Sequence, residues 1–202
     1  EFLTGFSMQF LPVGSIPYQQ YIRSELPGMV MDLNELGYTS VALHPYNSTG
    51  WNRNRVYEDF GFDEMVFKKN MHDPEILRKW VSDWGCYEKI IDLYESKGDA
   101  PLFMFNVTMQ NHGGYSESFD NLDEVISIEG PKKSYKSWTE RYLSLLNVSD
   151  EAFKRLTEYF KMQEEPTVIL MFGDHMPADH ITGVIRSAEN ESFEEGQDRY
   201  IV

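Results

Sequence analysis

Three continuous apolar runs, each ending at a histidine, stand out along an otherwise polar chain. They cover residues 40–44, 102–112 and 167–175. Because they do not alternate and are rich in β-branched and aromatic side chains, they are typical of strands buried on both faces. Helical apolar spacing lies between them, so we expect the strands to run parallel. The pattern predicts an α/β fold.

Helical spacing predicts four helices, one before the first run and three between the runs. The expected helices cover residues 29–36, 73–95, 135–146 and 149–161. Gly37 would close the first helix, and Asp73 followed by Pro74 would begin the second. We expect the other segments to be loops, with at most a short helix in the first: 1–23, 45–63, 113–134 and the acidic stretch after His175.

The carboxyl ends of parallel strands share one edge of a sheet, and open α/β sheets bind ligands at that edge. We therefore expect His44, His112 and His175 to lie together there. This convergence predicts a site built from imidazoles.

Asp174-His175, directly after the third run, is the sharpest chemical signal. A carboxylate and a neutral imidazole are suitable ligands for Mn²⁺ or Zn²⁺. Gly173 would allow close backbone approach at the end of a strand. The alternative is a turn aspartate beside a core histidine.

A second signal follows the first run, where Trp51 and Arg53 come shortly after His44. The guanidinium offers a fixed fork of donors for phosphate or sulfate, and the indole could stack on a small organic group. Arg55 competes for the anion-binding role, and a solvated surface loop is the alternative.

The remaining histidines carry weaker signals. His112 precedes two glycines, whose turn could expose its ring to a cleft, although an ordinary loop histidine is the alternative. His72 precedes the expected helix cap and is read as structural. The role of His180 stays open: it could be a further metal ligand, a substrate contact or an exposed loop residue.

The composition of the chain limits the classes of partner and site that it can have. A chain of 202 residues with 41% apolar residues can build one sizeable core. Its net charge of −15 repels nucleic acid and anionic lipid headgroups as broad-surface partners. The single cysteine, Cys86, excludes an internal disulfide and a cysteine-based zinc site. No apolar run is long enough to span a membrane.

Several segments, in this order, resemble sulfatase-domain proteins related to lipoteichoic acid synthase, which are phosphoglycerol transferases of the alkaline phosphatase superfamily. The matching segments are residues 1–5, 37–45, 51–57, 61–63, 107–113 and 166–175.

The resemblance implies a mainly parallel central sheet between helical layers, incomplete at both ends, with residues 1–202 forming part of a single catalytic domain. It implies a divalent metal ion, usually Mn²⁺, beside a threonine nucleophile. By position, the metal ligands would be Asp174 and His175. The pocket for the phosphoglycerol group would be lined by His44, Trp51, Arg53 and His112.

The resemblance also places the nucleophile and a further metal-binding acid upstream of Glu1, and Thr4 does not occupy the nucleophile position. We therefore expect a fragment that turns over little substrate and binds metal weakly by itself. The parent protein would lie on the extracellular face of a bacterial cytoplasmic membrane, held by upstream helices. Its substrate would be a phosphoglycerol-lipid or a polyanionic cell-envelope glycan.

Two other functions stay open. The parent protein could be a hydrolase of the same superfamily (a phosphodiesterase, phosphatase or sulfatase), because water can replace the acceptor without changing the pocket. It could also be a binding ectodomain that kept the fold without the chemistry.

Overall fold

The structure is a computed structural model that describes residues 1–129 and 134–188. The chain forms two compact units, Glu1–Met109 and Gln110–Val202. The expectation that residues 1–202 belong to a single catalytic domain stays a prediction.

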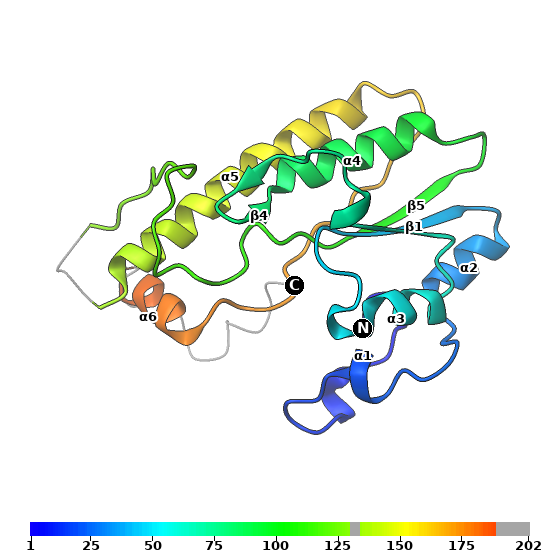
Figure 1. Ribbon diagram of the computed structural model, residues 1–202, viewed down its shortest axis with the longest axis horizontal. Helices are drawn as coiled ribbons and strands as arrows, with labels where there is room; N and C mark the ends of the chain where they lie inside the picture. Colours follow the sequence, from blue (N-terminus) through cyan, green and yellow to red (C-terminus); the bar gives the residue numbers. More distant parts are fainter. Residues whose placement is uncertain (130–133, 189–202) are drawn as a thin grey trace. The chain divides into compact units, whose positions relative to one another are not determined.

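A three-stranded parallel sheet forms the centre of the first unit (Figure 1). Strand β1 (Thr39–His44) lies between β2 (Glu64–Phe67) and β5 (Leu102–Asn106). Both faces of β1 are buried, because its consecutive residues 41–43 are all at most 2% exposed. The predicted parallel sheet with a doubly buried strand is therefore confirmed.

Helices lie on both faces of this sheet (Figure 1). Helix α2 (Met29–Glu35) contacts β1 on one side, and α4 (Asp83–Ser96) contacts β5 on the other. The helix predicted before the first strand is confirmed, and Gly37 follows it at φ +86°, the left-handed conformation that favours glycine. The mixed α/β fold, with a parallel sheet between helices, agrees with the sequence prediction.

Three predictions in the first unit are wrong. Residues 45–63 are not all loop, because a 3₁₀ turn, η2 (Gly50–Asn52), leads into α3 (Arg53–Asp59). Residues 73–81 are not helical but carry the antiparallel pair β3 (Ile76–Leu77) and β4 (Trp80–Val81). Asp73 caps no helix, because the next helix begins only at Asp83, and Ser82 caps α4 instead through its Oγ, which accepts the Gly85 amide hydrogen at 2.9 Å.

The first 23 residues are largely irregular, as expected, with short helical turns. These are η1 (Met8–Phe10) and α1 (Pro17–Gln20). A further 3₁₀ turn, η3 (Lys68–Asn70), directly follows β2. Strand β2 itself was missed, because its four residues are too few to give a recognisable apolar run.

Gly28 allows the N-terminal segment to approach α2 closely. The Met29 amide donates to the Leu3 carbonyl at 2.9 Å, and a Cβ on Gly28 would overlap that same oxygen. Gly28→Ala is therefore expected to lower the free energy of unfolding by about 2 kcal/mol, measured by urea denaturation. Gly98→Ala is the control, since its Cβ would meet nothing within 4 Å. Equal midpoints for the two variants would contradict the prediction.

The second unit is built on two helices. A single helix, α5 (Lys136–Lys161), replaces the two predicted ones, because residues 147–148 continue the helix. Helix α6 (Asp179–Ala188) packs on α5, although a loop was expected after His175. Residues 113–129 are irregular, as predicted, whereas residues 130–133 and 189–202 lie outside the described residues.

The third apolar run is not a strand. Residues 166–173 have no ladder partner in the described part of the chain, and Val168 is 95% exposed while Leu170 is 65% exposed. A strand exists only when a neighbouring strand pairs with it, which an apolar run alone does not reveal. No helix among the described residues is long and apolar enough to cross a membrane.

Candidate functional site

His44 ends β1 at the carboxyl edge of the sheet, as predicted. It is 5% exposed, and its buried Nδ1 has no hydrogen-bond partner among the described residues. Burial first, and the nearby positive charge of Arg53 second, lower its pKa from 6.5 to about 3. The imidazole is therefore neutral at neutral pH, with one N–H to donate and one lone pair to accept.

Arg53 begins α3, and its side chain is buried, with 7% exposed. Its Nη1 donates to the Asn47 carbonyl at 2.6 Å. Within residues 1–129 and 134–188, no carboxylate pairs with this guanidinium, although the chain carries 33 acidic residues. A buried, uncompensated cation is costly, so this position is prepared for an anion.

The backbone before Arg53 is strained. Trp51 and Asn52 both adopt left-handed conformations, with φ of +57° and +56°. Asparagine tolerates this region, whereas tryptophan rarely adopts it. A Cβ on Gly50 would lie 2.9 Å from Arg53 Nη1, so the guanidinium lies tightly against the turn. Strain of this kind is concentrated at functional sites, and here it leaves the Trp51 side chain 53% exposed.

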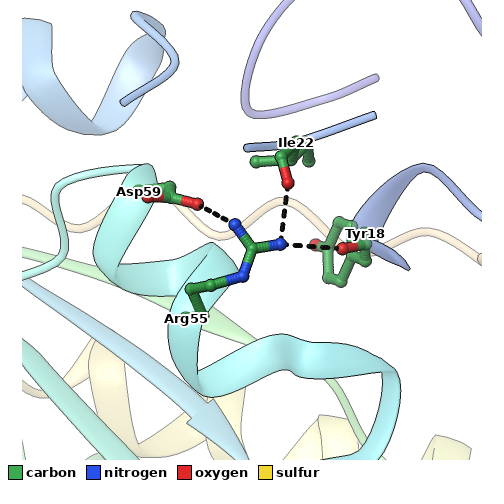
Figure 2. A network of polar contacts seen from close by, with 4 residues as sticks. All are labelled: Tyr18, Ile22, Arg55 and Asp59. Carbon is green, nitrogen blue, oxygen red and sulfur yellow. Dashed lines mark hydrogen bonds and ion pairs between the residues drawn. The ribbon is translucent and has the colours of Figure 1, made fainter. Parts of the chain in front are cut away.

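Arg55, unlike Arg53, has an acidic partner and a structural role (Figure 2). Its Nη1 pairs with Asp59 Oδ2 at 2.7 Å, and its Nη2 donates to the carbonyls of Ile22 at 2.7 Å and Tyr18 at 3.3 Å. The guanidinium therefore ties α3 to the segment around α1. Arg55, which competed with Arg53 for the anion-binding role in the sequence, is thus paired with Asp59.

A pocket of about 540 Å³ opens beside these residues, and the sequence analysis missed it. It is lined by Tyr46, Asn47, Ser48, Lys68 and Lys69. The signal was present, because two adjacent lysines directly follow a strand in a strongly acidic chain.

His112 belongs to the second unit. The apolar run does not continue as a strand to this residue, because β5 ends at Asn106. His112 is exposed, and its two predecessors anchor the loop: Gln110 Nε2 and Asn111 Nδ2 donate to Ser149 Oγ at 3.0 and 2.7 Å. Gln110, fully buried, was missed because a single amide gives no pattern.

Asp174 and His175 place their polar atoms near each other. Asp174 Oδ2 lies 3.7 Å from His175 Nε2, and both side chains are 77% exposed. His175 Nδ1 lies 2.9 Å from the Met176 carbonyl, so a proton on Nδ1 leaves the Nε2 lone pair on the Asp174 side. These two side chains are suitable ligands for a divalent ion. They form only part of a coordination shell, because no three metal-binding side chains gather in the described part of the chain.

His180 fits a packing role, whereas the structural reading of His72 stays a prediction. The His180 ring lies between Tyr135 and Trp138, with ring centroids 4.8 and 5.4 Å apart. This stacking favours a packing role in the second unit over a metal ligand. His72 is an exposed residue between η3 and β3. Because His44 lies in the first unit and His112 and His175 in the second, their convergence at one edge stays a prediction.

The low pKa of His44 predicts a loss of stability in acid. Between about pH 6 and 4 the unfolded chain binds a proton here that the folded chain does not, so stability falls as pH falls, by about 1.4 kcal/mol per pH unit. His44→Asn is therefore expected to flatten the pH dependence of the urea midpoint. His72→Asn, at an exposed position, is the control. A slope unchanged in His44→Asn would contradict this account.

The chain is similar to known proteins over most of its length. Residues 1–197 match the Sulfatase family. The chain is 38% identical over 88% of its length to a candidate cyclic β-1,2-glucan modification protein of Rhizobium meliloti, and 27% identical over 82% to lipoteichoic acid synthase 1 of Bacillus subtilis. The phosphoglycerol transferase GacH of Streptococcus pyogenes, solved with sn-glycerol-1-phosphate, has a similar fold over 81% of this chain and 44% of its own, with a TM-score of 0.67 and 22% identity.

The chain spans about a quarter of the length of the two curated relatives, 28% of the Rhizobium protein and 25% of the Bacillus synthase. The resemblance to proteins related to lipoteichoic acid synthase is confirmed by these matches. The chain belongs to the Sulfatase family.

Proposed function

We propose that the chain is part of an extracellular, metal-dependent phosphoglycerol transferase that acts on lipid- or glycan-linked phosphoglycerol. One observation carries the proposal: Arg53 is buried at the carboxyl end of the sheet with no carboxylate partner in the described part of the chain. A phosphoryl group would supply the missing negative charge and accept two parallel hydrogen bonds from the guanidinium.

The neighbouring residues would complete this subsite. Neutral His44 would donate its N–H to a phosphoryl oxygen without adding charge, and the exposed Trp51 indole would cover the glycerol carbons. We also assign His112 to the binding of this group. Asp174 and His175 would hold a divalent metal ion, which we propose to be Mn²⁺. When bound, such an ion neutralises phosphoryl charge and lowers the pKa of an attacking hydroxyl.

The nucleophile in this proposal is a threonine upstream of Glu1. Its hydroxyl would attack phosphorus and break the bond to the lipid oxygen, so that diacylglycerol leaves with the proton. An acceptor hydroxyl would then attack the same phosphorus and break the bond to the threonine oxygen, so that threonine regains a proton and the acceptor carries the phosphoglycerol group. Residues 1–202 in isolation would then release no product. The glucan-related relative supports a glycan acceptor, and the synthase relative supports a lipid-linked donor.

The test is product analysis with the full-length protein. It would be incubated with phosphatidylglycerol carrying a labelled glycerol headgroup, with and without a cyclic glucan. Transfer predicts diacylglycerol together with label on the glucan. Free glycerol phosphate at an equal rate in both reactions would assign a hydrolase instead. Release of sulfate from aryl sulfates, with no phosphoester turnover, would overturn the phosphoglycerol proposal.

A further inference from the structure

Residues 6–13, which we call the apolar loop, leave large apolar side chains uncovered. Phe6 is 63% exposed and Phe10 is 85% exposed, while Met8 is 45% exposed and Val13 is fully exposed. Single exposed apolar side chains are ordinary on a protein surface, but a contiguous group of them marks a surface that binds a partner or a membrane. The apolar loop is therefore a candidate contact surface.

The loop is held in a defined conformation. The Met8 amide donates to Glu1 Oε1 at 2.7 Å, and the Leu11 amide donates to the Met8 carbonyl at 3.0 Å in η1. On either side of the loop, Leu3 and Ile22 are buried in the core of the first unit. The exposed side chains are thus carried by a backbone that is hydrogen-bonded within the loop and anchored at both ends.

The apolar loop lies within an uncharged stretch of an otherwise acidic chain. Residues 2–22 contain no Asp, Glu, Lys or Arg, although 25% of the residues in the whole chain are charged. The net charge of −15 repels anionic lipid headgroups from the surface in general. An uncharged loop avoids this repulsion locally, and its apolar side chains fit the boundary between headgroups and acyl chains. These properties favour a lipid bilayer over a charged protein surface as the partner.

The loop leads directly into the element that contacts the Arg53 subsite. Helix α1 follows the loop and contacts η2, the turn that carries Trp51 and precedes Arg53. Arg55 on α3 also donates to the Tyr18 carbonyl of α1, as Figure 2 shows. A loop inserted into the surface of a bilayer would therefore hold the Arg53 subsite close to the phosphodiester headgroups.

We infer that the apolar loop is a membrane-docking surface, which inserts into the headgroup layer of a bilayer that contains the donor lipid. This contact is made by the folded unit itself and is separate from any membrane-spanning helix upstream. Its role in turnover rests on the proposed function, but insertion into lipid does not.

Photo-crosslinking tests insertion with the unmodified full-length protein. The protein is reconstituted into vesicles of phosphatidylcholine and phosphatidylglycerol, including a phosphatidylglycerol with a diazirine in its acyl chain, and cross-linked peptides are identified by mass spectrometry. Peptides with residues 6–13 are expected to carry at least about tenfold more lipid than peptides with Leu36 or Met162, which are apolar and 73% and 83% exposed. Equal yields at these sites, or no lipid on residues 6–13, would overturn the docking surface.

Vesicle kinetics then test whether docking serves turnover. Phe6→Ser with Phe10→Ser is compared with Leu36→Ser with Met162→Ser, which removes exposed apolar side chains elsewhere. The loop variant is expected to raise KM for phosphatidylglycerol vesicles about tenfold, and to leave kcat/KM unchanged for a short-chain phosphatidylglycerol dissolved as monomers. An equal loss with both forms of the donor, or the same loss in both double variants, would contradict docking.

Further outcomes separate this inference from the proposed function and from another occupant of the surface. Lipid on residues 6–13 in a protein without transferase activity would keep the docking surface and reject the proposed function. Transfer without lipid on these residues would do the reverse. A dimer in light scattering that Phe6→Ser with Phe10→Ser converts to a monomer would assign the surface to a second copy of the chain and overturn the inference.

Discussion

Arg53→Lys is expected to lower kcat/KM of the full-length enzyme by about a hundredfold or more while leaving the fold intact. Lysine keeps the positive charge but loses the fork that binds two phosphoryl oxygens at once, so the variant isolates geometry from charge. The effect should be large because Arg53 is buried, where a charge-assisted bond to the transferring group is stronger than at the surface. Initial rates against donor concentration provide the measurement.

Arg55→Lys is the matched control, two residues further along the same helix. Arg55 bonds to Asp59 and to two backbone carbonyls, so its loss should lower the melting temperature and leave kcat/KM nearly unchanged well below that temperature. The reverse outcome, with Arg55→Lys inactive and Arg53→Lys near normal, would show that the anion-binding assignment in this loop is wrong.

The elements that could be predicted from the sequence are those whose signal is local. Strand β1 is an apolar run buried on both faces, and α2 has apolar spacing closed by a glycine at positive φ. The Arg55–Asp59 pair could also be expected, because residues four apart on a helix are neighbours. In each case the residues that determine the structure lie within one segment.

The wrong secondary-structure predictions have the opposite cause. In those segments the structure is determined by contacts with residues far apart in the sequence. Residues 167–173 have the composition of a buried strand, but pairing depends on a neighbour that the run does not specify. Residues 76–81 form a hairpin whose turn contains Arg78 at φ +55°, a conformation that arginine rarely adopts and that the sequence therefore does not predict. Helix α3 follows two left-handed residues, so its start lacked an ordinary cap signal.

The features of the candidate site can also be divided into those that the sequence predicts and those that it does not. His44 could be placed at a sheet edge because its strand could be predicted, and Arg53 could be singled out by its chemistry. The burial of Arg53 without an acidic partner could not be read from sequence, since it depends on how the turn at Trp51 and Asn52 folds back. The pocket lysines were missed for a related reason: β2, which positions them, is too short to detect.

Asp174→Asn and His175→Gln are each expected to raise the Mn²⁺ concentration for half-maximal activity of the full-length enzyme by at least tenfold. Asparagine lacks the carboxylate charge and glutamine lacks the imidazole lone pair, so each variant removes one of the two donors that face each other across 3.7 Å. Electron paramagnetic resonance of free Mn²⁺ measures binding directly and does not depend on turnover.

His180→Gln is the control that separates a ligand from a packing residue. Its ring packs between those of Tyr135 and Trp138, so the variant should lower the melting temperature and leave the Mn²⁺ titration unchanged. In residues 1–202 in isolation, wild-type Mn²⁺ binding should be weak, because a stable site generally needs three or four ligands. Tight binding by this chain that is lost in His180→Gln would identify His180 as a third ligand and overturn the assignment of Asp174 and His175 as a half shell.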